Sequence, residues 1–235
     1  MMIGRCAPLL AFLLGATALP AFATPYWIAW ESDDWPENQG WDHQSYNYYG
    51  GPLATRTLNG GTMTSDGSAS PGIVDDYFMY RAGAIDPAPG EEFVLQYRMR
   101  VDASTDYPWD VGASVFSNDG RFIGMRSTLD RVRPSVAPTW EISFEPGQFH
   151  TYEIRSTDMR ECRFFLDGVL LHDGHFVQGA TPAYVAWGDC CVPAASAATW
   201  DYLRFGVVTA PEADGAVVAS VLALMALARC HRRCS

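Results

Sequence analysis

The chain contains no lysine, and all sixteen of its basic residues are arginine. Between residues 24 and 210, twelve arginines face twenty-five aspartates and glutamates, an excess of thirteen negative charges with histidine neutral. A surface of that sign repels phosphate backbones, so nucleic acid is not an expected partner. We attribute the uniform use of arginine to codon usage rather than to a binding adaptation.

Long apolar runs and helical periodicity are also missing. The two longest apolar stretches lie at the ends, from Ala7 to Leu19 and from Gly215 to Ala228. Each is shorter than the roughly 20 residues that a membrane-spanning helix needs. Between them no helical period persists beyond a turn or two, and no segment repeats. We therefore expect one all-β domain at residues 24–210, with short apolar helices only at the termini.

Residues 1–23 have the pattern of a secretory signal. Arg5 precedes the first apolar run, and Ala21-Phe22-Ala23 fits the small-x-small cleavage pattern. We predict cleavage after Ala23, with a retained membrane anchor as the alternative. The protein is thus expected to be exported.

The last segment, residues 211–235, carries three features in order. Pro211-Glu212 precedes the second apolar run, and Arg229, Arg232 and Arg233 follow it. This arrangement resembles the C-terminal sorting signals of bacterial surface proteins of the PEP-CTERM type, with Ala213 in place of the second proline. The resemblance implies transient anchoring in the inner membrane, with arginines retained on the cytoplasmic side, and processing by a sorting protease. A plain tail anchor is the alternative.

Residues 149–171 predict three short antiparallel strands. Tyr152 and Ile154 alternate with polar residues, and Asp167-Gly168 supplies a turn before the last strand. The clearest strand lies at 93–101, where every second residue is apolar, and we expect it to be central. Those residues are Phe93, Leu95, Tyr97, Met99 and Val101.

Other strands are predicted at 73–81 and on both sides of the turn Asn118-Asp119-Gly120. Residues 139–145 predict a further strand, with Trp140, Ile142 and Phe144 facing inward. Residues 50–72 indicate loops and edge strands with a turn at Gly60-Gly61.

Eight aromatic residues lie between positions 26 and 49: Tyr26, Trp27, Trp30, Trp35, Trp41, Tyr46, Tyr48 and Tyr49. Aromatic rings stack on sugar faces, so a carbohydrate platform is one reading. Packing is the preferred reading, because in a sandwich the first strand often pairs beside the last and would bury its rings.

The residues Phe149-His-Thr-Tyr152, the strand end Leu166-Asp-Gly-Val169 and the closing TWDYLRFGVV at 199–208 carry a family resemblance. Together, residues 26–208 resemble the concanavalin A-like lectin/glucanase superfamily, close to its laminin-G-like branches. This implies an antiparallel jelly-roll β-sandwich. Such domains serve many functions, so the fold alone does not assign one. We expect a non-catalytic cell-surface module that binds carbohydrate or extracellular matrix. The alternatives are a carbohydrate-active enzyme, either glycosidase or polysaccharide lyase, and a structural envelope protein without ligand.

Glu141 and Glu145 are the only catalytic candidates. With Ser143 between them, they resemble the E-x-D-x-E signature of laminarinase-type glycoside hydrolases, in which two carboxylates act on the glycosidic bond. The central aspartate is replaced by serine, and the motif stands directly before the 149–171 region. We therefore prefer to read these residues as outward side chains of an ordinary strand.

If a glycan binds, alternation places several charged residues on outward sheet faces, including Arg98, Arg100 and Arg163. Arginine forks suit acidic sugars, although ordinary surface charge is the preferred reading. The segment His172-Asp-Gly-His175 is predicted to be a solvated polar loop.

Three cysteines remain between the two ends, and in an oxidising compartment we predict a disulfide from Cys162 to Cys190 or Cys191. No cofactor is expected apart from a structural calcium ion. The superfamily resemblance implies that ion at Asp33 or Asp34 with Asp201, and the alternative is that these carboxylates are only solvated.

Overall fold

The computed structural model describes residues 26–69, 74–83, 85–105, 111–136, 140–179, 182–189 and 196–210. The predicted signal peptide, the C-terminal segment and their expected helices lie outside these residues. No helix in the described part is long and apolar enough to cross a membrane. The elements are β1 (Tyr26–Glu31), η1 (Pro36–Gln39), β2 (Asp42–Asn47), β3 (Thr55–Leu58), β4 (Met63–Asp66), β5 (Val74–Tyr80), β6 (Glu91–Ala103), β7 (Val111–Phe116), β8 (Arg121–Ser127), β9 (Arg131–Pro134), β10 (Ile142–Ser143), β11 (His150–Ser156), β12 (Glu161–Leu166), β13 (Val169–His175), β14 (Val177–Gln178), β15 (Tyr184–Asp189) and β16 (Ala197–Thr209).

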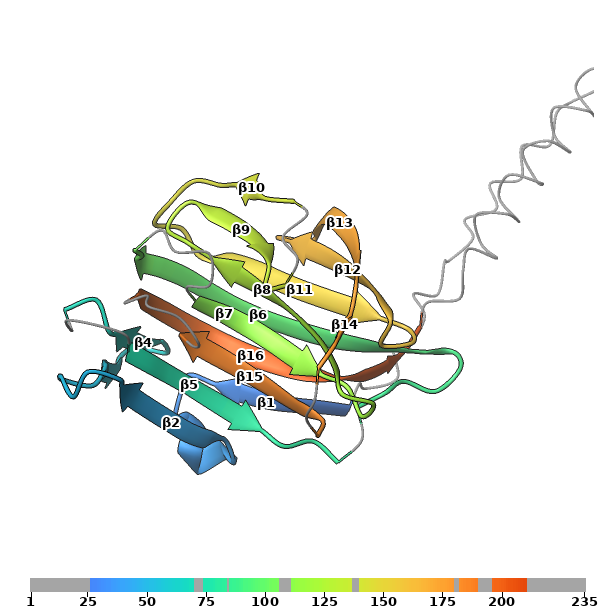
Figure 1. Cartoon of the computed structure of the whole chain (residues 1–235), viewed down its shortest axis with the longest axis horizontal. Coiled ribbons are helices and arrows are strands. Elements are labelled where there is room, and N and C mark those ends of the chain that lie inside the picture. The colour runs from blue at the N-terminus through green and yellow to red at the C-terminus, as the bar shows by residue number, and fades with distance from the viewer. Residues whose placement is uncertain are drawn as a thin grey trace, which may run out of the picture.

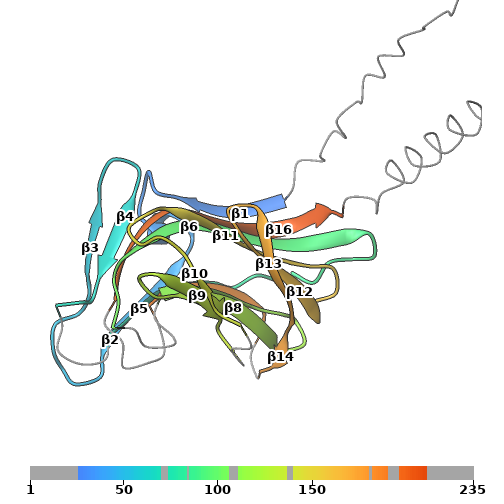
Figure 2. The same ribbon diagram turned by 90° about the horizontal axis from the view of Figure 1, so that it is seen from above.

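The strands form two eight-stranded antiparallel sheets. Sheet A has the order β13-β12-β11-β6-β16-β4-β3, with β1 also paired to β16. Sheet B has the order β10-β9-β8-β7-β15-β5-β2, with β14 paired to β8. The sheets lie face to face in two layers (Figures 1 and 2). The predicted antiparallel jelly-roll β-sandwich is therefore confirmed.

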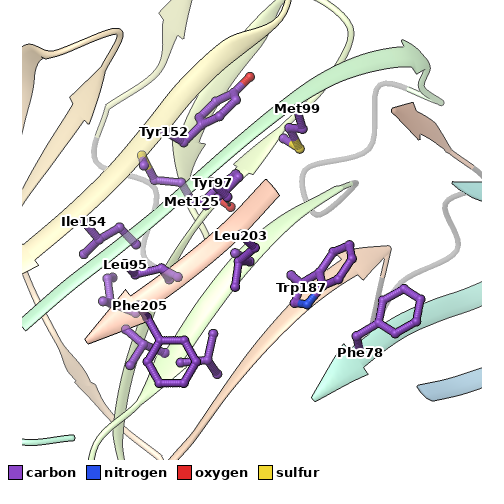
Figure 3. Close-up of a cluster of buried hydrophobic side chains, with 14 of the residues drawn as sticks. Phe78, Leu95, Tyr97, Met99, Met125, Tyr152, Ile154, Trp187, Leu203 and Phe205 are labelled. Atoms are coloured by element: carbon purple, nitrogen blue, oxygen red, sulfur yellow. Dashed lines mark hydrogen bonds between the residues drawn. The ribbon is translucent and has the colours of Figure 1, made fainter. Parts of the chain in front are cut away.

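The long strand β6 lies at the centre of sheet A, between β11 and β16, as predicted. Its five alternating apolar residues, Phe93 to Val101, are all at most 3% exposed. They contribute roughly 8–15 kcal/mol gross to folding at about 1.5–3 kcal/mol each, an upper bound before chain entropy is subtracted. Figure 3 shows three of them among side chains of both sheets, including Met125 and Trp187.

The predicted hairpins at 149–171 form as β11, β12 and β13. Asp167 and Gly168 both have positive φ, at 50° and 78°, which is the turn geometry that a two-residue hairpin needs. The segment 172–175 differs from its prediction as a loop. It belongs to β13, where Gly174 pairs with Cys162, because the hairpin continues to the edge of the sheet.

The predicted strand at 139–145 was too long. Only Ile142 and Ser143 form a ladder, with β9, at the edge of sheet B, and Thr139 lies outside the described residues. The inward alternation is nevertheless present, because Trp140, Ile142 and Phe144 pack against the core. Every second side chain of this segment thus packs inward, although only two of its residues pair with a neighbouring strand.

The first strand pairs with the last, as expected, and carries Trp30 into the core. Trp30 is fully buried, and its ring lies 4.7 Å from that of Trp187. Trp41 is also buried, with its ring 5.9 Å from that of Trp187. The packing interpretation holds for these tryptophans.

A buried carboxylate joins the two sheets at one corner. Asp76, on β5 of sheet B, is 1% exposed and accepts hydrogen bonds from His43 Nε2 at 2.7 Å and from Ser65 Oγ. Ser65 lies on β4 of sheet A. Burial by itself raises the pKa of Asp76, but the bonds from His43 and Ser65 outweigh it and hold that pKa below its usual value.

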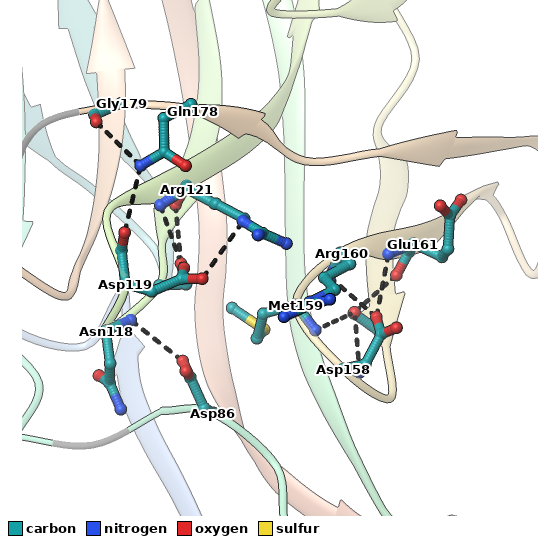
Figure 4. Close-up of polar contacts among 12 residues, drawn as sticks. Asp86, Asn118, Asp119, Arg121, Asp158, Met159, Arg160, Glu161, Gln178 and Gly179 are labelled. Carbon is teal, nitrogen blue, oxygen red and sulfur yellow. Dashed lines mark hydrogen bonds and ion pairs between the residues drawn. The ribbon is translucent and has the colours of Figure 1, made fainter.

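Side-chain carboxylates fix the loops at one end of the sandwich (Figure 4). Asp158 Oδ1 accepts the backbone N–H groups of Arg160 and Glu161 at 2.8 and 2.9 Å. Asp119, in the predicted turn between β7 and β8, accepts the Ser117 hydroxyl at 2.6 Å and pairs with Arg121. These bonds hold the turns in place.

Candidate functional site

The outer face of sheet B carries a cavity of about 370 Å³. It is formed by residues from four neighbouring strands, β5, β15, β7 and β8, together with two residues that follow β9. The lining residues are Tyr77, Met79, Ser114, Phe116, Phe122, Arg126, Ser135, Val136, Tyr184 and Ala186. The cavity thus crosses the middle of the sheet.

Small residues form the floor of this groove. Ser114 on β7 stands opposite Gly124 on β8 and Ala186 on β15. A Cβ atom at Gly124 would lie 2.3 Å from Ser114 Oγ, so only glycine fits there without a shift. Side chains alternate across a strand, and the outward positions that would hold bulky polar residues on an ordinary wet sheet hold small ones here.

Three aromatic rings form one wall. Phe116 on β7 stands opposite Tyr184 on β15 and Phe122 on β8. The Phe116 ring centroid lies 4.0 Å from that of Tyr184 and 5.0 Å from that of Phe122, and both pairs are stacked. All three side chains are only partly buried, so part of their surface is open to a ligand.

Polar groups line the other side. Arg126 is 8% exposed and donates to Gly188 O at 3.2 Å and to Ser114 Oγ at 3.5 Å. Burial lowers its pKa, while nearby groups, including Tyr97 and Asp189, counteract the shift. The guanidinium stays charged, because arginine is protonated at any ordinary pH. Tyr77 completes this side, with its hydroxyl donating to Gln44 Oε1 at 2.6 Å.

Three of the tyrosines predicted to pack are instead exposed, beside this groove at the β2 edge. Tyr46, Tyr48 and Tyr49 are 52%, 64% and 74% exposed. The packing interpretation is therefore wrong for these residues, because β2 is an edge strand and the chain after it runs away from the core. The hydroxyl of Tyr48 donates to Asp75 Oδ2 at 2.9 Å, a bond that raises the pKa of Tyr48.

The two candidate catalytic glutamates are not among the residues that line the groove. Glu141 is exposed and pairs with Arg131 at 3.3 Å and Arg133 at 3.7 Å. Glu145 is exposed as well. Their placement fits the reading of outward side chains at the edge of the sheet.

The predicted ligand-binding arginines lie on the outer face of sheet A, away from the groove. Arg98 pairs with Asp201, Arg100 pairs with Asp102 at 2.5 Å, and Arg163 pairs with Glu92 at 2.5 Å. Arg98 and Arg100 both lie over the ring of Phe149, at 4.8 and 5.1 Å. Each of the three thus already has an acidic partner.

The expected calcium ligands make contacts with other side chains. Asp33 and Asp34 accept hydrogen bonds from Gln39 and Asn38 beside η1, and Asp201 pairs with Arg98. Within the described residues, no group of three or more His, Cys, Asp or Glu side chains is placed to hold a metal ion. Calcium binding at these residues stays a prediction.

Cys162 faces inward, as predicted, and is a free, 3% exposed thiol. Burial raises its pKa to about 12. Its predicted partners, Cys190 and Cys191, lie outside the described residues.

Asp189, the described residue next to Cys190, lies near the opposite end of β6 from Cys162. Cys162 lies beside Ser156 of β11, which pairs with Phe93 near the start of β6. Asp189 accepts a hydrogen bond from Ser196, which precedes the partner of Ala103 at the end of β6. Phe93 and Ala103 are about 33 Å apart along β6 at about 3.3 Å per residue. Disulfides need Cα separations of roughly 4.4–6.8 Å, and because Cys190 and Cys191 are not described, the pairing stays a prediction.

The sequence analysis did not identify the groove residues. Their signal was the run of small residues at outward positions of three neighbouring strands: Gly112, Ser114, Gly124, Ala186 and Gly188. That signal becomes visible only once the strands are placed side by side in register.

Comparison with known proteins identifies the fold. No protein-family model matches the sequence, and no curated protein matches it. Solved structures share the sandwich. An endo-1,3-beta-glucanase from Streptomyces sioyaensis is 11% identical with a TM-score of 0.51, over 73% of this chain and 90% of that one. A carbohydrate esterase from Shiga toxin-encoding bacteriophage phi24B is 13% identical with a TM-score of 0.55, over 78% and 98%. The chain thus has the concanavalin A-like jelly-roll fold.

Proposed function

We propose that the groove on sheet B binds carbohydrate. The observation that carries this proposal is the combination of a small-residue floor with a stacked wall of three partly exposed rings, Phe116, Phe122 and Tyr184. Ligand pockets typically combine apolar surface with a few placed polar groups. Here Arg126, Ser114 and Tyr77 supply those polar groups, and the partly exposed rings offer apolar surface to the C–H groups of sugars.

We propose binding without catalysis. Glycoside hydrolysis commonly uses two carboxylates about 5–10 Å apart on either side of the scissile bond. The described residues that line the groove include neither Asp nor Glu. The fold shared with an endo-1,3-beta-glucanase favours a carbohydrate-active enzyme as the second candidate. A structural envelope protein without ligand is the third.

The proposed setting is the cell surface. Residues 1–23 would direct export, residues 24–210 would form the binding domain, close to the laminin-G-like kind, and residues 211–235 would hold the protein in the inner membrane until a protease releases it. A glycan or extracellular matrix is the proposed partner. Structural calcium at Asp33 or Asp34 with Asp201 would be tested by adding a chelator, which would lower the melting temperature if the ion binds.

The test is binding of the purified protein to an array of neutral and acidic oligosaccharides. Phe116→Leu keeps an apolar side chain but removes the central ring of the wall, and we expect it to weaken binding at least tenfold. Phe149→Leu is the matched control, because its ring lies on the outer face of sheet A. Circular dichroism would verify that both variants fold.

Three outcomes would contradict the proposal. The array shows no bound glycan, or both variants lose affinity equally, which would move the site away from the groove. Release of reducing ends from a bound oligosaccharide would show hydrolysis and would favour the carbohydrate-active enzyme over the binding module.

A further inference from the structure

The outer face of sheet B continues beyond the cavity, from β5 to the edge strand β2. Gly188 on β15 stands opposite Tyr77 on β5, and Tyr77 stands opposite Gln44 on β2, so these three residues form one outward row across the sheet. In the next outward row, Asp75 on β5 stands opposite Tyr46 on β2. From β8 to β2 the face spans about 19 Å at about 4.8 Å between strands, which is several times the length of one sugar ring.

Exposed aromatic rings stand at that edge. More than half of the surface of Tyr46 and Tyr48 is open to solvent, and both lie beside Asp75. Large exposed apolar side chains that gather in one place commonly mark interaction sites. Amphipathic tyrosines of this kind are favoured at recognition surfaces, because they offer contact area at low entropy cost.

Tyr48 is also held in position. Its hydroxyl donates to Asp75, a carboxylate that is only 3% exposed, so the polar end of an otherwise exposed ring is fixed to the sheet. A ring that is already held loses less freedom when it is covered by a ligand. Tyr49 is a natural comparison, because it is even more exposed and its backbone N–H donates to Asn47 Oδ1 at 3.0 Å.

We propose that the groove takes a linear polysaccharide chain rather than a single terminal sugar, with Tyr46 and Tyr48 stacking on the units that leave the groove over β2. This inference rests on the proposed carbohydrate binding in the groove. The rings of Phe116, Phe122 and Tyr184 hold the inner units, and the two outer tyrosines add affinity that depends on chain length.

The experiment compares a disaccharide with a hexasaccharide of the same linkage. The probes are β-1,3-, β-1,4- and mixed-linkage gluco-oligosaccharides and oligouronates, titrated into the full protein by calorimetry. We expect the hexasaccharide to bind at least tenfold more tightly than the disaccharide. Tyr46→Ala with Tyr48→Ala removes most of that advantage and leaves the disaccharide affinity unchanged. Tyr49→Ala, the matched control, changes neither affinity. Tyr48→Phe, which keeps the ring but loses the bond to Asp75, gives an intermediate loss.

The outcomes separate the inference from the function on which it rests. If the two lengths bind equally well, or if the double tyrosine variant weakens both equally, the extended site is wrong while binding in the groove stands. If Phe116→Leu leaves both affinities unchanged, or if no probe binds, the proposed groove function fails and the extended site fails with it.

Discussion

The outer faces of the two sheets are built on opposite principles. On sheet A, charged side chains fill the face and pair with one another, as Arg155 and Arg163 do with the buried Glu92. On sheet B, small residues such as Ser114 and Ala186 leave a hollow that aromatic rings border. The first face satisfies its own polar groups, whereas the second leaves surface for another molecule.

This difference shows why charge alone is a poor guide to a binding site. A guanidinium that already holds a carboxylate must give up that partner to bind an anion, which cancels much of the gain. A hollow with apolar walls has no such partner to lose, and covering its rings removes apolar surface from water. Shape, rather than the number of arginines, distinguishes the two faces.

The comparison requires that the two sheets stay packed against each other. The largest expected loss of stability comes from a substitution at Asp76, which connects them. Asp76→Asn removes the charge that accepts hydrogen bonds from His43 and from Ser65 of the opposite sheet. Bonds to a charged group contribute about 1.5–3 kcal/mol each, and the asparagine oxygen keeps part of them. We expect a loss of about 2–3 kcal/mol in the free energy of unfolding, measured in urea.

The same variant has a signature in pH dependence. The folded-state pKa of Asp76 lies below its usual value, so the unfolded chain takes up the proton first as pH falls. Stability from this group is full above about pH 5 and is lost as pH drops through the folded-state pKa. The wild type should lose stability below about pH 4 more steeply than Asp76→Asn. Asp42→Asn, an exposed control on β2, should match the wild type, and equal slopes for all three proteins would refute the role of Asp76.

The charge network of sheet A gives the next effect. Glu92 is 1% exposed and receives both Arg155 and Arg163, whose side chains are about a third and a half exposed. Because the arginines stay partly solvated, we expect Glu92→Gln to cost about 1–2 kcal/mol, between surface and buried ion pairs. Glu145→Gln, on an exposed residue, should cost nothing measurable in urea unfolding.

Glycan affinity should stay unchanged in Glu92→Gln. A tenfold loss of affinity with the fold intact would place ligand binding on sheet A and reverse the comparison of the two faces.

Filling the hollow tests sheet B directly. Ala186→Leu puts extra atoms into a cavity of about 370 Å³, so we expect little change in stability but at least a tenfold loss of glycan affinity, which is about 1.4 kcal/mol. Thr151→Leu places the same leucine side chain on the outer face of sheet A, opposite Arg98, as the control. Calorimetric titration of both variants measures the difference, and undiminished binding by Ala186→Leu would exclude the groove.

The sequence predicted those strands whose two faces differ in chemistry. The alternation at Phe93 to Val101 and at Tyr152 and Ile154 is strict, and both strands were found where expected. β15 carries no such pattern, because its outward Ala186 and Gly188 are as apolar or small as its inward neighbours. The same small outward residues that form the floor of the groove therefore remove the polar–apolar alternation by which β15 could have been predicted.

The candidate site was predictable only in part for the same reason. Aromatic residues near Tyr46 and Tyr48 suggested a platform, but their exposure depends on β2 being an edge strand, which spacing does not reveal. The arginines were placed on outward faces correctly. Their pairing with carboxylates from other strands, such as Arg98 with Asp201, follows from register and not from alternation.

The smallest effect is expected at Arg98 itself. Its side chain is 39% exposed and that of Asp201 is 29% exposed, so their pair should contribute no more than about 1 kcal/mol, in line with surface ion pairs. The contact with the Phe149 ring adds about 0.5 kcal/mol at such an exposed site. A double-mutant cycle with Arg98→Ala and Asp201→Asn, read by urea unfolding at low and high salt, should give a small coupling energy that salt weakens. Glycan affinity should be unaffected by Arg98→Ala. A loss of glycan affinity in this variant would show that an arginine paired with a carboxylate on the outer face of sheet A still binds the ligand.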